Sequence, residues 1–323
     1  MSRHRADGQH VAGWQPELES AVVAAGLDPE SVRDVVVRAL DEDLGPRRQD
    51  VTTAATIPAE QERSALLVAR ADGVVAGLPL WPIVLAEAAA MLDLPVPTTT
   101  LAVTDGARVR TGDVLGQFHG RSQVLLVAER TALNLVCRLS GIATHTRAWA
   151  DALAGTRARV LDTRKTTPGL RMLEKYAVRC GGGMNKRMGL FDIAMIKDNH
   201  KVAAGSIKAA YTQVRTRYPE VEVEVEVDTP DEAEEAVAAG ARFLLFDNMS
   251  VDVLAAAVAK ARAATPEPIL LEATGGLTLD EARAYADTGV DYLSVGALTH
   301  SSPGLDLALD LLPPDTPAAG AAG

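Results

Sequence analysis

Aromatic residues and cysteines are scarce in this chain. Phe, Trp and Tyr together make up 4% of the 323 residues, and the only cysteines are Cys137 and Cys180. Ala, Val and Leu must therefore fill most of the core, and a hydrophobic fraction of 47% is ample for a folded protein. Two cysteines without an apolar leader segment predict buried free thiols in a reducing compartment, so we expect a cytoplasmic protein.

Long hydrophobic runs are also lacking. No stretch approaches the ~20 apolar residues that a membrane span needs, so we expect no membrane segment. The net charge of −11 argues against nonspecific binding to nucleic acid. Residues 1–13 contain no apolar run and residues 314–323 are rich in Pro, Ala and Gly, so we expect a disordered arm and a disordered tail.

Positive charge, in contrast, gathers in one window. Residues 162–201 carry nine Lys or Arg and four Asp or Glu, so the window is at +5 while the rest of the chain is at −16. Gly181–Gly183 and the ends of apolar runs lie in the same window. Cations beside glycines predict a site for a small polyanion. RNA is an alternative ligand, but the basic segments lack the interleaved aromatic side chains that stack on bases.

The first part of the chain mixes helices and strands without regular alternation, which predicts an α+β domain. Turn signals at Asp105-Gly106 and Thr111-Gly112-Asp113 separate short strands there. A long helix follows, and it could break near Ser140-Gly141. The predicted helices are residues 18–25, 32–40, 80–91 and 122–153, and the predicted strands are residues 64–71, 73–76 and 98–103.

Beyond this long helix, short apolar strands alternate with helices. Strands followed by helices across short links predict a parallel sheet that closes into a barrel. Only about six strands are visible, so we expect an irregular, incomplete TIM-like α/β barrel. The predicted strands are residues 159–161, 193–196, 221–227, 243–246, 269–271 and 292–295, and the helices are residues 168–180, 203–218, 231–239, 251–263 and 279–287.

The active site of such a barrel lies at the carboxyl ends of the strands. Arginines can hold carboxylates in a bidentate manner, and lysines act as point charges. Carboxylates are hard oxygen ligands that suit Mg²⁺ carried on phosphates, and glycines let backbone N–H groups approach a phosphate. Most of the residues of these kinds stand at or just after the ends of the predicted strands, and Lys186 and Arg187 follow the glycines before the second strand. In chain order the set is Arg164, Lys165, Lys186, Arg187, Lys197, Glu226, Asp247, Thr274, Gly275 and Gly296.

Several other polar residues have simpler interpretations. Glu222 and Glu224 alternate with valines on one strand, which is typical of a solvated face. Asn199 and His200 can cap the following helix, and His145 on the long helix is more often structural. A Schiff-base role for the lysine after the second strand is a further alternative, but an anionic ligand beside it would raise its pKa rather than lower it.

The chain resembles the quinolinate phosphoribosyltransferase family. The resemblance spans residues 40–296, and its most specific segments are Glu129–Asn134, Asp162–Leu170 and Lys175–His200. It implies an N-terminal open α/β sandwich, here residues 14–138, joined to a barrel, here residues 139–298, with residues 299–313 packing back on the sandwich. It also implies a homodimer, or a higher oligomer, with shared active sites.

The resemblance further implies roles for the site residues. Arg130, reaching across the dimer, would bind the two quinolinate carboxylates together with Arg164, Lys186, Arg187 and Lys197. Lys165, Glu226 and Asp247 would be catalytic and would serve phosphoribosyl pyrophosphate (PRPP), with the two acids holding Mg²⁺. Thr274, Gly275 and Gly296 would bind the 5′-phosphate. The family commonly has His at the position of Lys186, and only His titrates near neutrality.

The reaction implied is a pentosyl transfer in NAD biosynthesis. Quinolinate and PRPP would give nicotinate mononucleotide, pyrophosphate and CO₂ with Mg²⁺ as cofactor. Two alternatives remain. One is a related phosphoribosyltransferase that uses another aromatic acid, such as nicotinate. The other is an inactive paralogue that acts as an interaction protein, although Arg164, Lys165, Glu226 and Asp247 are all present here.

Overall fold

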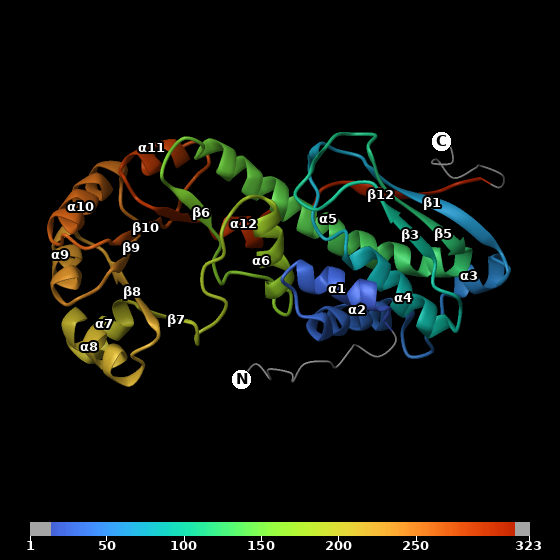
Figure 1. Cartoon of the computed structure of the whole chain (residues 1–323), viewed down its shortest axis with the longest axis horizontal. Helices are drawn as coiled ribbons and strands as arrows, with labels where there is room; N and C mark the ends of the chain where they lie inside the picture. The colour runs from blue at the N-terminus through green and yellow to red at the C-terminus, as the bar shows by residue number, and fades with distance from the viewer. Residues whose placement is uncertain (1–13, 314–323) are drawn as a thin grey trace. The chain divides into compact units, whose positions relative to one another are not determined.

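The computed structural model describes residues 14–313, so the predicted arm and tail lie outside the described residues. The chain forms two compact units (Figure 1). The first, here the N unit, runs through Thr144 and also takes in Met172–Cys180 and the chain from Pro303. The second, here the barrel unit, consists of His145–Arg171 and Gly181–Ser302. Each unit is described separately below.

The N unit is built on a four-stranded antiparallel sheet in the order β12-β1-β5-β3. Leu67, on the central strand, pairs with Leu309 on one side and Gly116 on the other, so the end of the chain completes this sheet. The strands are β1 (Glu62–Ala69), β3 (Thr98–Leu101), β5 (Val114–Arg121) and β12 (Leu307–Leu311), and a separate pair consists of β2 (Gly73–Val74) and β4 (Arg108–Val109).

Helices pack on this sheet through apolar side chains. Trp81 on α4 stacks on Phe118 of β5 with the ring centroids 5.0 Å apart, and both side chains are fully buried. A short helix after Asp50 was not predicted, although this residue is a regular N-cap that accepts hydrogen bonds from two backbone N–H groups. The helices are α1 (Pro16–Ala24), α2 (Pro29–Leu44), α3 (Val51–Thr56), α4 (Leu80–Leu92), α5 (Ser122–Ala152) and α6 (Arg171–Cys180).

Helix α5 is unbroken, so the break considered near Ser140-Gly141 is wrong. Gly141 serves close packing instead, because a Cβ at this position would come 2.0 Å from the carbonyl oxygen of Pro303. Ser140 Oγ accepts a hydrogen bond from the backbone N–H of Ala76 at 3.0 Å. Both residues therefore fix the helix against neighbouring segments of the N unit, which explains why a small pair stands in mid-helix.

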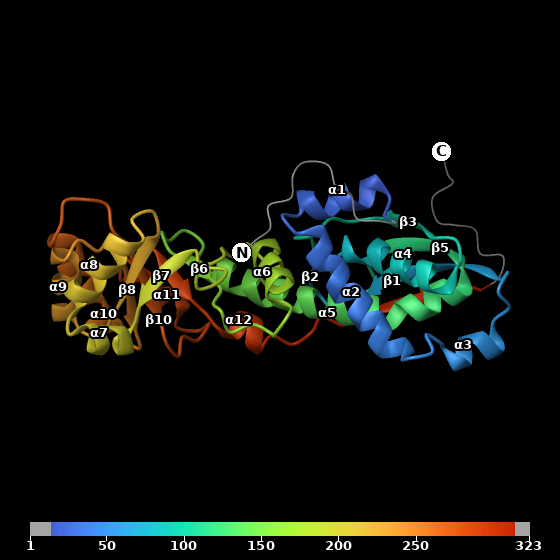
Figure 2. The same cartoon turned by 90° about the horizontal axis from the view of Figure 1, so that it is seen from below.

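The barrel unit contains the six parallel strands that the alternation predicted. Strands β6, β7, β8 and β10 are labelled in Figure 2. Their order is β6-β11-β10-β9-β8-β7, and every pair in the sheet is parallel. Buried Val, Leu and Phe side chains make up most of β8 and β9. The strands are β6 (Arg159–Leu161), β7 (Ile193–Ile196), β8 (Glu222–Val227), β9 (Phe243–Asp247), β10 (Leu270–Thr274) and β11 (Tyr292–Ser294).

Several predicted helices end or begin elsewhere; the helix 279–287, for example, begins only at Ala282. The predicted helix 203–218 is two helices, because Gly205 adopts φ +90° and Ser206 starts a new N-cap. The predicted helix 168–180 begins only at Arg171, because Gly169 turns with φ +82°. The helices of this unit are α7 (Asp198–Ala204), α8 (Ile207–Arg217), α9 (Pro230–Ala238), α10 (Val251–Ala263), α11 (Ala282–Asp287) and α12 (Ala297–His300).

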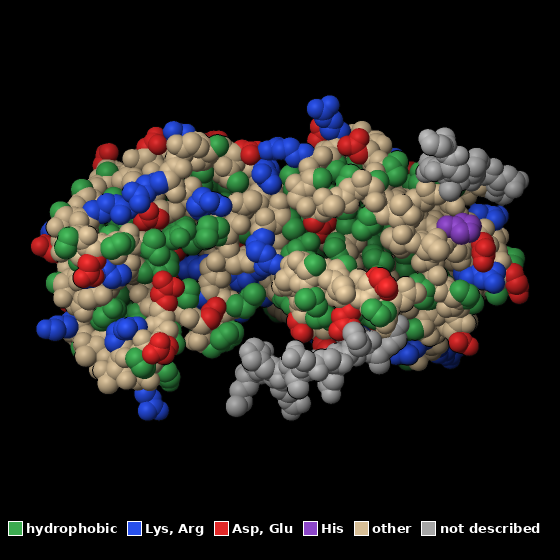
Figure 3. Space-filling model, viewed as in Figure 1, with side chains coloured by type: hydrophobic (Ala, Val, Ile, Leu, Met, Phe, Trp, Pro, Cys, Tyr) green, Lys and Arg blue, Asp and Glu red, His purple; other side chains and the backbone are tan. Residues whose placement is uncertain are grey.

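The sheet does not close on itself, since β6 and β7 are not paired with each other within the described part of the chain. The segment Met184–Arg187 lies along β6 instead: Met184 N–H donates to Val160, and its carbonyl accepts from Asp162 N–H. Acidic and basic side chains are interspersed over the visible surface of this unit (Figure 3). Between residues 14 and 313, no helix is long and apolar enough to cross a membrane.

Candidate active site

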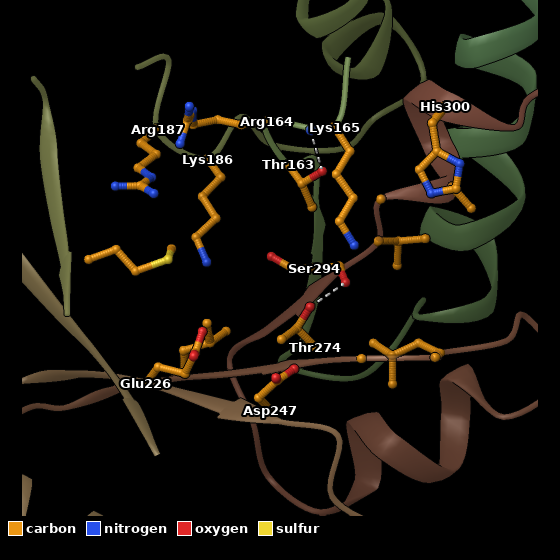
Figure 4. A pocket seen from close by; sticks show the side chains of 18 of the residues that line it. Thr163, Arg164, Lys165, Lys186, Arg187, Glu226, Asp247, Thr274, Ser294 and His300 are labelled. Atoms are coloured by element: carbon orange, nitrogen blue, oxygen red, sulfur yellow. Dashed lines mark hydrogen bonds between the residues drawn. The ribbon is translucent and has the colours of Figure 1, made fainter. Parts of the chain in front are cut away.

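A pocket of about 540 Å³ opens at the carboxyl ends of the barrel strands (Figure 4). It lies wholly within the barrel unit. The structure therefore brings together side chains that the sequence spreads over more than 130 positions. Ten of the eleven predicted site residues line this pocket: Arg164, Lys165, Lys186, Arg187, Lys197, Glu226, Asp247, Thr274, Gly275 and Gly296.

Two arginines form one side of the pocket. Burial and the nearby charge of Arg164 together lower the pKa of Arg187. The Arg187 guanidinium donates from Nη1 to the carbonyl of Ile193 on β7 at 3.1 Å. The Nε of Arg164 is buried and has no hydrogen-bond partner among the described residues. Two neighbouring cations of this kind are suited to a ligand with carboxylate groups.

Two side chains, Asp162 and Arg171, hold the loops that carry these arginines. Asp162, fully buried after β6, accepts hydrogen bonds from Asn185 Nδ2 at 2.6 Å and from the backbone N–H of Lys186 at 2.8 Å. Arg171 links the same two loops, because its Nε donates to Thr166 Oγ1 and its Nη1 donates to the carbonyl of Met188. The positions of both arginines are thus fixed by residues outside the pocket.

Lys165 extends into the pocket toward its glycine-lined end (Figure 4). Both backbone polar groups of Lys165 are hydrogen-bonded: its N–H donates to Thr163 Oγ1, and its carbonyl accepts from Thr299 Oγ1. Gly296 makes room for the side chain, because a Cβ there would come 2.9 Å from Lys165 Cδ. The side chain of Lys165 therefore packs directly against the backbone of Gly296, the second residue after β11.

Two carboxylates lie opposite the arginines (Figure 4). Glu226 is 7% exposed, and Lys197 Nζ donates to its Oε2 at 2.5 Å. Burial and the neighbouring Glu226 raise the pKa of Asp247, whose carboxylate has no hydrogen bond or ion pair to any residue that the structure describes. His200 Nδ1 accepts from the N–H of Lys197, so the predicted capping role of His200 is confirmed.

Backbone geometry shapes the end of the pocket formed by β10 and β11. Gly275 has φ +94°, and a Cβ there would come 2.8 Å from the backbone nitrogen of Asn248. The N–H of Asn248 donates to the carbonyl of Thr274, and Thr274 Oγ1 donates to the carbonyl of Ser294. Only glycine fits this turn, which leaves its backbone open to a bound phosphate.

The interpretation of Glu224 as a solvated residue is wrong. Its side chain is fully buried, and it accepts a hydrogen bond from Lys186 Nζ at 3.0 Å. Burial and the neighbouring Glu272 raise the pKa of Glu224 to about 8. Glu222, on the same strand, is exposed as predicted. The alternating glutamates of β8 thus leave the solvent as the strand enters the barrel.

Several residues of the pocket were not predicted, among them Ser294 and His300. His300 lies one helical turn after Gly296, and this i, i+4 spacing from a predicted phosphate residue was the signal that could have found it. Met195 and Leu245 give the pocket an apolar part. His145 is structural as predicted: Trp149 Nε1 donates to its Nε2, and Ser302 Oγ lies 2.8 Å from its Nδ1.

Arg130 does not line the pocket. It lies on α5 in the N unit, and its side chain is exposed. The neighbouring Glu129 has a pKa raised by burial, an effect that the Arg130 charge partly offsets. The predicted role of Arg130 across a dimer therefore stays a prediction.

A metal bound by protein side chains alone does not fit this pocket. Within the range 14–313, no group of three or more His, Cys, Asp or Glu could hold a metal ion. Glu226 and Asp247 do fit a Mg²⁺ that arrives on phosphates, because such an ion needs only one or two protein carboxylates. The free carboxylate of Asp247 is the better placed of the two, since Glu226 is already paired with Lys197.

The barrel and its pocket define an α/β-barrel enzyme whose site is built for anionic substrates. The sequence comparisons identify the family. A model described as the C-terminal domain of quinolinate phosphoribosyl transferase matches residues 142–310, and the N-terminal domain model matches residues 50–140. The chain belongs to the quinolinate phosphoribosyl transferase family.

Individual relatives agree over most of their length. The chain is 48% identical over 282 residues to the nicotinate-nucleotide pyrophosphorylase (carboxylating) of Mycobacterium leprae, which covers 87% of this chain and 98% of that protein. It is 44% identical to a probable enzyme of the same name from Bacillus subtilis, over 80% of this chain and 87% of that one. The crystal structure of NadC from Streptococcus pyogenes matches with a TM-score of 0.81 at 38% identity, covering 89% of this chain and 99% of that chain.

Proposed function

We propose that this protein transfers the phosphoribosyl group of PRPP to quinolinate and releases nicotinate mononucleotide, pyrophosphate and CO₂. One observation carries the proposal: two arginines face two carboxylates across a single pocket with a glycine-lined end. A dicarboxylate, a pyrophosphate with its metal, and a 5′-phosphate each have a chemically matching side of this pocket. Family membership supports the same reaction.

The arginine side would bind the pyridine dicarboxylate. Arg164 and Arg187 can each form paired hydrogen bonds to a carboxylate, and Lys197, half exposed at the rim, can add a point charge once it leaves Glu226. Met195 and Leu245 offer apolar surface to the ring. Binding in this way brings the ring nitrogen to C1 of the ribose and replaces a random encounter with a fixed geometry.

The other side would bind PRPP. Glu226 and Asp247 would hold Mg²⁺ on the pyrophosphate, and the 5′-phosphate would rest on the backbone of Gly275 and Gly296. When bound, the metal would neutralise the charge of the leaving pyrophosphate. Lys165 would stabilise the same developing charge from the protein side.

The chemistry then follows from the substrate. The ring nitrogen attacks C1 of the ribose, and the bond from C1 to the pyrophosphate oxygen breaks. The nitrogen becomes cationic and so draws electrons from the adjacent carbon. The bond to the neighbouring carboxylate breaks, CO₂ leaves, and the electron pair left on the ring carbon takes up a proton. The protein contributes mainly orientation and electrostatic stabilisation.

We further propose a homodimer in which Arg130 reaches the substrate of a second copy. Arg130 is exposed on α5, and Leu190 and Phe191 on the barrel unit are 73% and 77% exposed. These two neighbouring apolar side chains would be removed from water at such an interface. Sedimentation of the purified protein at micromolar concentration should give twice the chain mass, and a sedimenting monomer would contradict the proposal.

Activity is tested with purified protein, PRPP and Mg²⁺, offered either quinolinate or nicotinate. We expect nicotinate mononucleotide and CO₂ in equal amounts from quinolinate. Chelation of the metal should stop the reaction. Nucleotide formed from nicotinate at a similar rate would instead favour the related phosphoribosyltransferase. No turnover of either acid would favour the inactive paralogue.

A further inference from the structure

Three ionisable side chains form a buried group at the inner end of the pocket. Lys186 Nζ donates to Glu224 Oε1 at 3.0 Å and also to Glu272 Oε1, which accepts a second hydrogen bond from Ser294 Oγ. Both glutamates are fully buried, and the lysine side chain is 7% exposed. We call these three side chains, together with Ser294, the Lys186 cluster. They come from three different strands and the Met184–Arg187 segment.

The charge of Lys186 is already matched inside this cluster. One ammonium group faces two acidic side chains, of which Glu224 has a raised pKa, and two of its three N–H donors point at them. The second oxygen of each carboxylate is buried without a hydrogen-bond partner among residues 14–313. The cluster therefore has no surplus positive charge to offer an anionic ligand. Arg164 and Arg187, by contrast, are close enough for one charge to disfavour the other.

The backbone of Lys186 joins the cluster to the substrate-binding arginine. Its N–H donates to Asp162 Oδ1 at 2.8 Å, and the next residue, Arg187, donates to the Ile193 carbonyl on β7 at 3.1 Å. The Met184–Arg187 segment thus lies beside β6, and the guanidinium of Arg187 connects it to β7 at the opposite edge of the sheet. The long side chain of Lys186 is its connection to the middle strands β8 and β10.

We propose that Lys186 is a positioning residue, which braces the open barrel and holds Arg187 in place, and that it does not bind the carboxylates of the substrate. This inference rests on the proposed function for the identity of the substrate. It separates Lys186 from Lys165, which lines the same pocket but whose Nζ forms no ion pair with any described residue. The two lysines form a matched pair for an experiment.

The first experiment compares Lys186→Met with Lys165→Met by thermal unfolding. Breaking a buried ion pair by removing one partner is strongly destabilising, because the other charges stay buried. We expect Lys186→Met to lower Tm by about 10 °C and Lys165→Met to change it by less than about 2 °C. An unchanged Tm in Lys186→Met overturns the proposal.

The second experiment restores neutrality in the triple variant Glu224→Gln, Lys186→Met, Glu272→Gln. Replacing every member of a buried charge cluster is often far less costly than removing one. We expect most of the lost Tm to return. At 20 °C, Lys186→Met should raise KM for quinolinate about tenfold with KM for PRPP within about twofold, and the triple variant should return KM for quinolinate to within about threefold.

The outcomes separate a brace from a ligand. A triple variant with recovered Tm but a KM for quinolinate still raised tenfold or more would mean that Lys186 contacts the substrate, and the proposal fails. A Lys186→Met variant with lowered Tm and normal KM also overturns the claim that it positions Arg187. The unfolding series needs no substrate. Wild-type protein that turns over no quinolinate therefore overturns the proposed function alone, and the brace still stands or falls on Tm.

Discussion

Gly296 and Lys165 are packed so closely that one could not gain an atom without moving the other. A Cβ on Gly296 would come 2.9 Å from Lys165 Cδ and 3.3 Å from the ring of His300. The φ of Gly296 is −64°, which any residue can adopt, so the requirement for glycine here is one of space. A glycine just after β11 thus sets the position of a lysine that follows β6.

Gly296→Ala should therefore lower activity while leaving the fold intact. The lysine end is flexible and can move aside, so Tm should change little. Displacing a catalytic group by about 1 Å can cost up to about 100-fold in rate, and we expect kcat to fall at least tenfold. Gly304→Ala is the control, because a Cβ there meets its neighbours at an ordinary 3.6 Å. Equal kcat values for the two variants would contradict the role of Lys165.

Arg164→Ala tests the arginine side of the pocket. Loss of a bidentate charged contact to a carboxylate should raise KM for quinolinate roughly 100-fold, with a much smaller effect on KM for PRPP. Arg164→Lys should recover only part of the loss, since an ammonium group cannot reproduce the paired geometry. Arg217→Ala, an exposed arginine at the end of α8, serves as the control. If Arg164→Ala and Arg217→Ala gave the same KM, the carboxylate assignment would fail.

Glu226→Ala tests the acidic side. Removing one of two carboxylates should raise the Mg²⁺ concentration at half-maximal rate about tenfold and raise KM for PRPP. The matched control is Glu222→Ala on the same strand, whose side chain is exposed. Normal Mg²⁺ dependence in Glu226→Ala would show that the ion is held elsewhere.

The glutamates of β8 also show how much of the structure could be predicted from the sequence. Strict alternation on β8 predicted the strand correctly, and helix α10 was predicted to the residue. The same alternation misplaced Glu224, because an alternating strand is usually solvated on its polar face. In the barrel unit both faces of this strand are covered, so Glu224 and Glu226 are buried along with the valines, and only Glu222 at the start of the strand is exposed. Only the packing of the whole barrel unit distinguishes a buried from a solvated polar face, and no local pattern encodes that packing.

The site was more predictable than the supports beneath it. Residues at or just after strand ends are positioned by the parallel topology alone, and eight of the ten predicted residues that meet in the pocket are of this kind. The bond from Asp162 to the Lys186 backbone depends on partners 24 residues apart and on a loop conformation. Such contacts follow from the packed structure, and periodicity does not indicate them.

His145 should make stability depend on pH. Burial lowers the pKa of its imidazole, whose ordinary value is 6.5, so the folded protein favours the neutral ring. The unfolded chain then binds the proton more readily, and the contribution of His145 is fully present above pH 6.5 and is lost as pH falls through the folded pKa. Each pKa unit of difference is worth about 1.4 kcal/mol.

The measurement is the free energy of unfolding in urea between pH 7.5 and 5, for wild type and for His145→Gln. Gln can accept from Trp149 and donate to Ser302 as the neutral histidine does, but it does not titrate. The advantage of wild type over the variant should shrink as pH falls from 6.5. Taking the difference cancels the carboxylates that titrate in both proteins. An advantage that stays constant or grows toward pH 5 would mean that the folded protein accepts a proton on His145 as easily as the unfolded chain does.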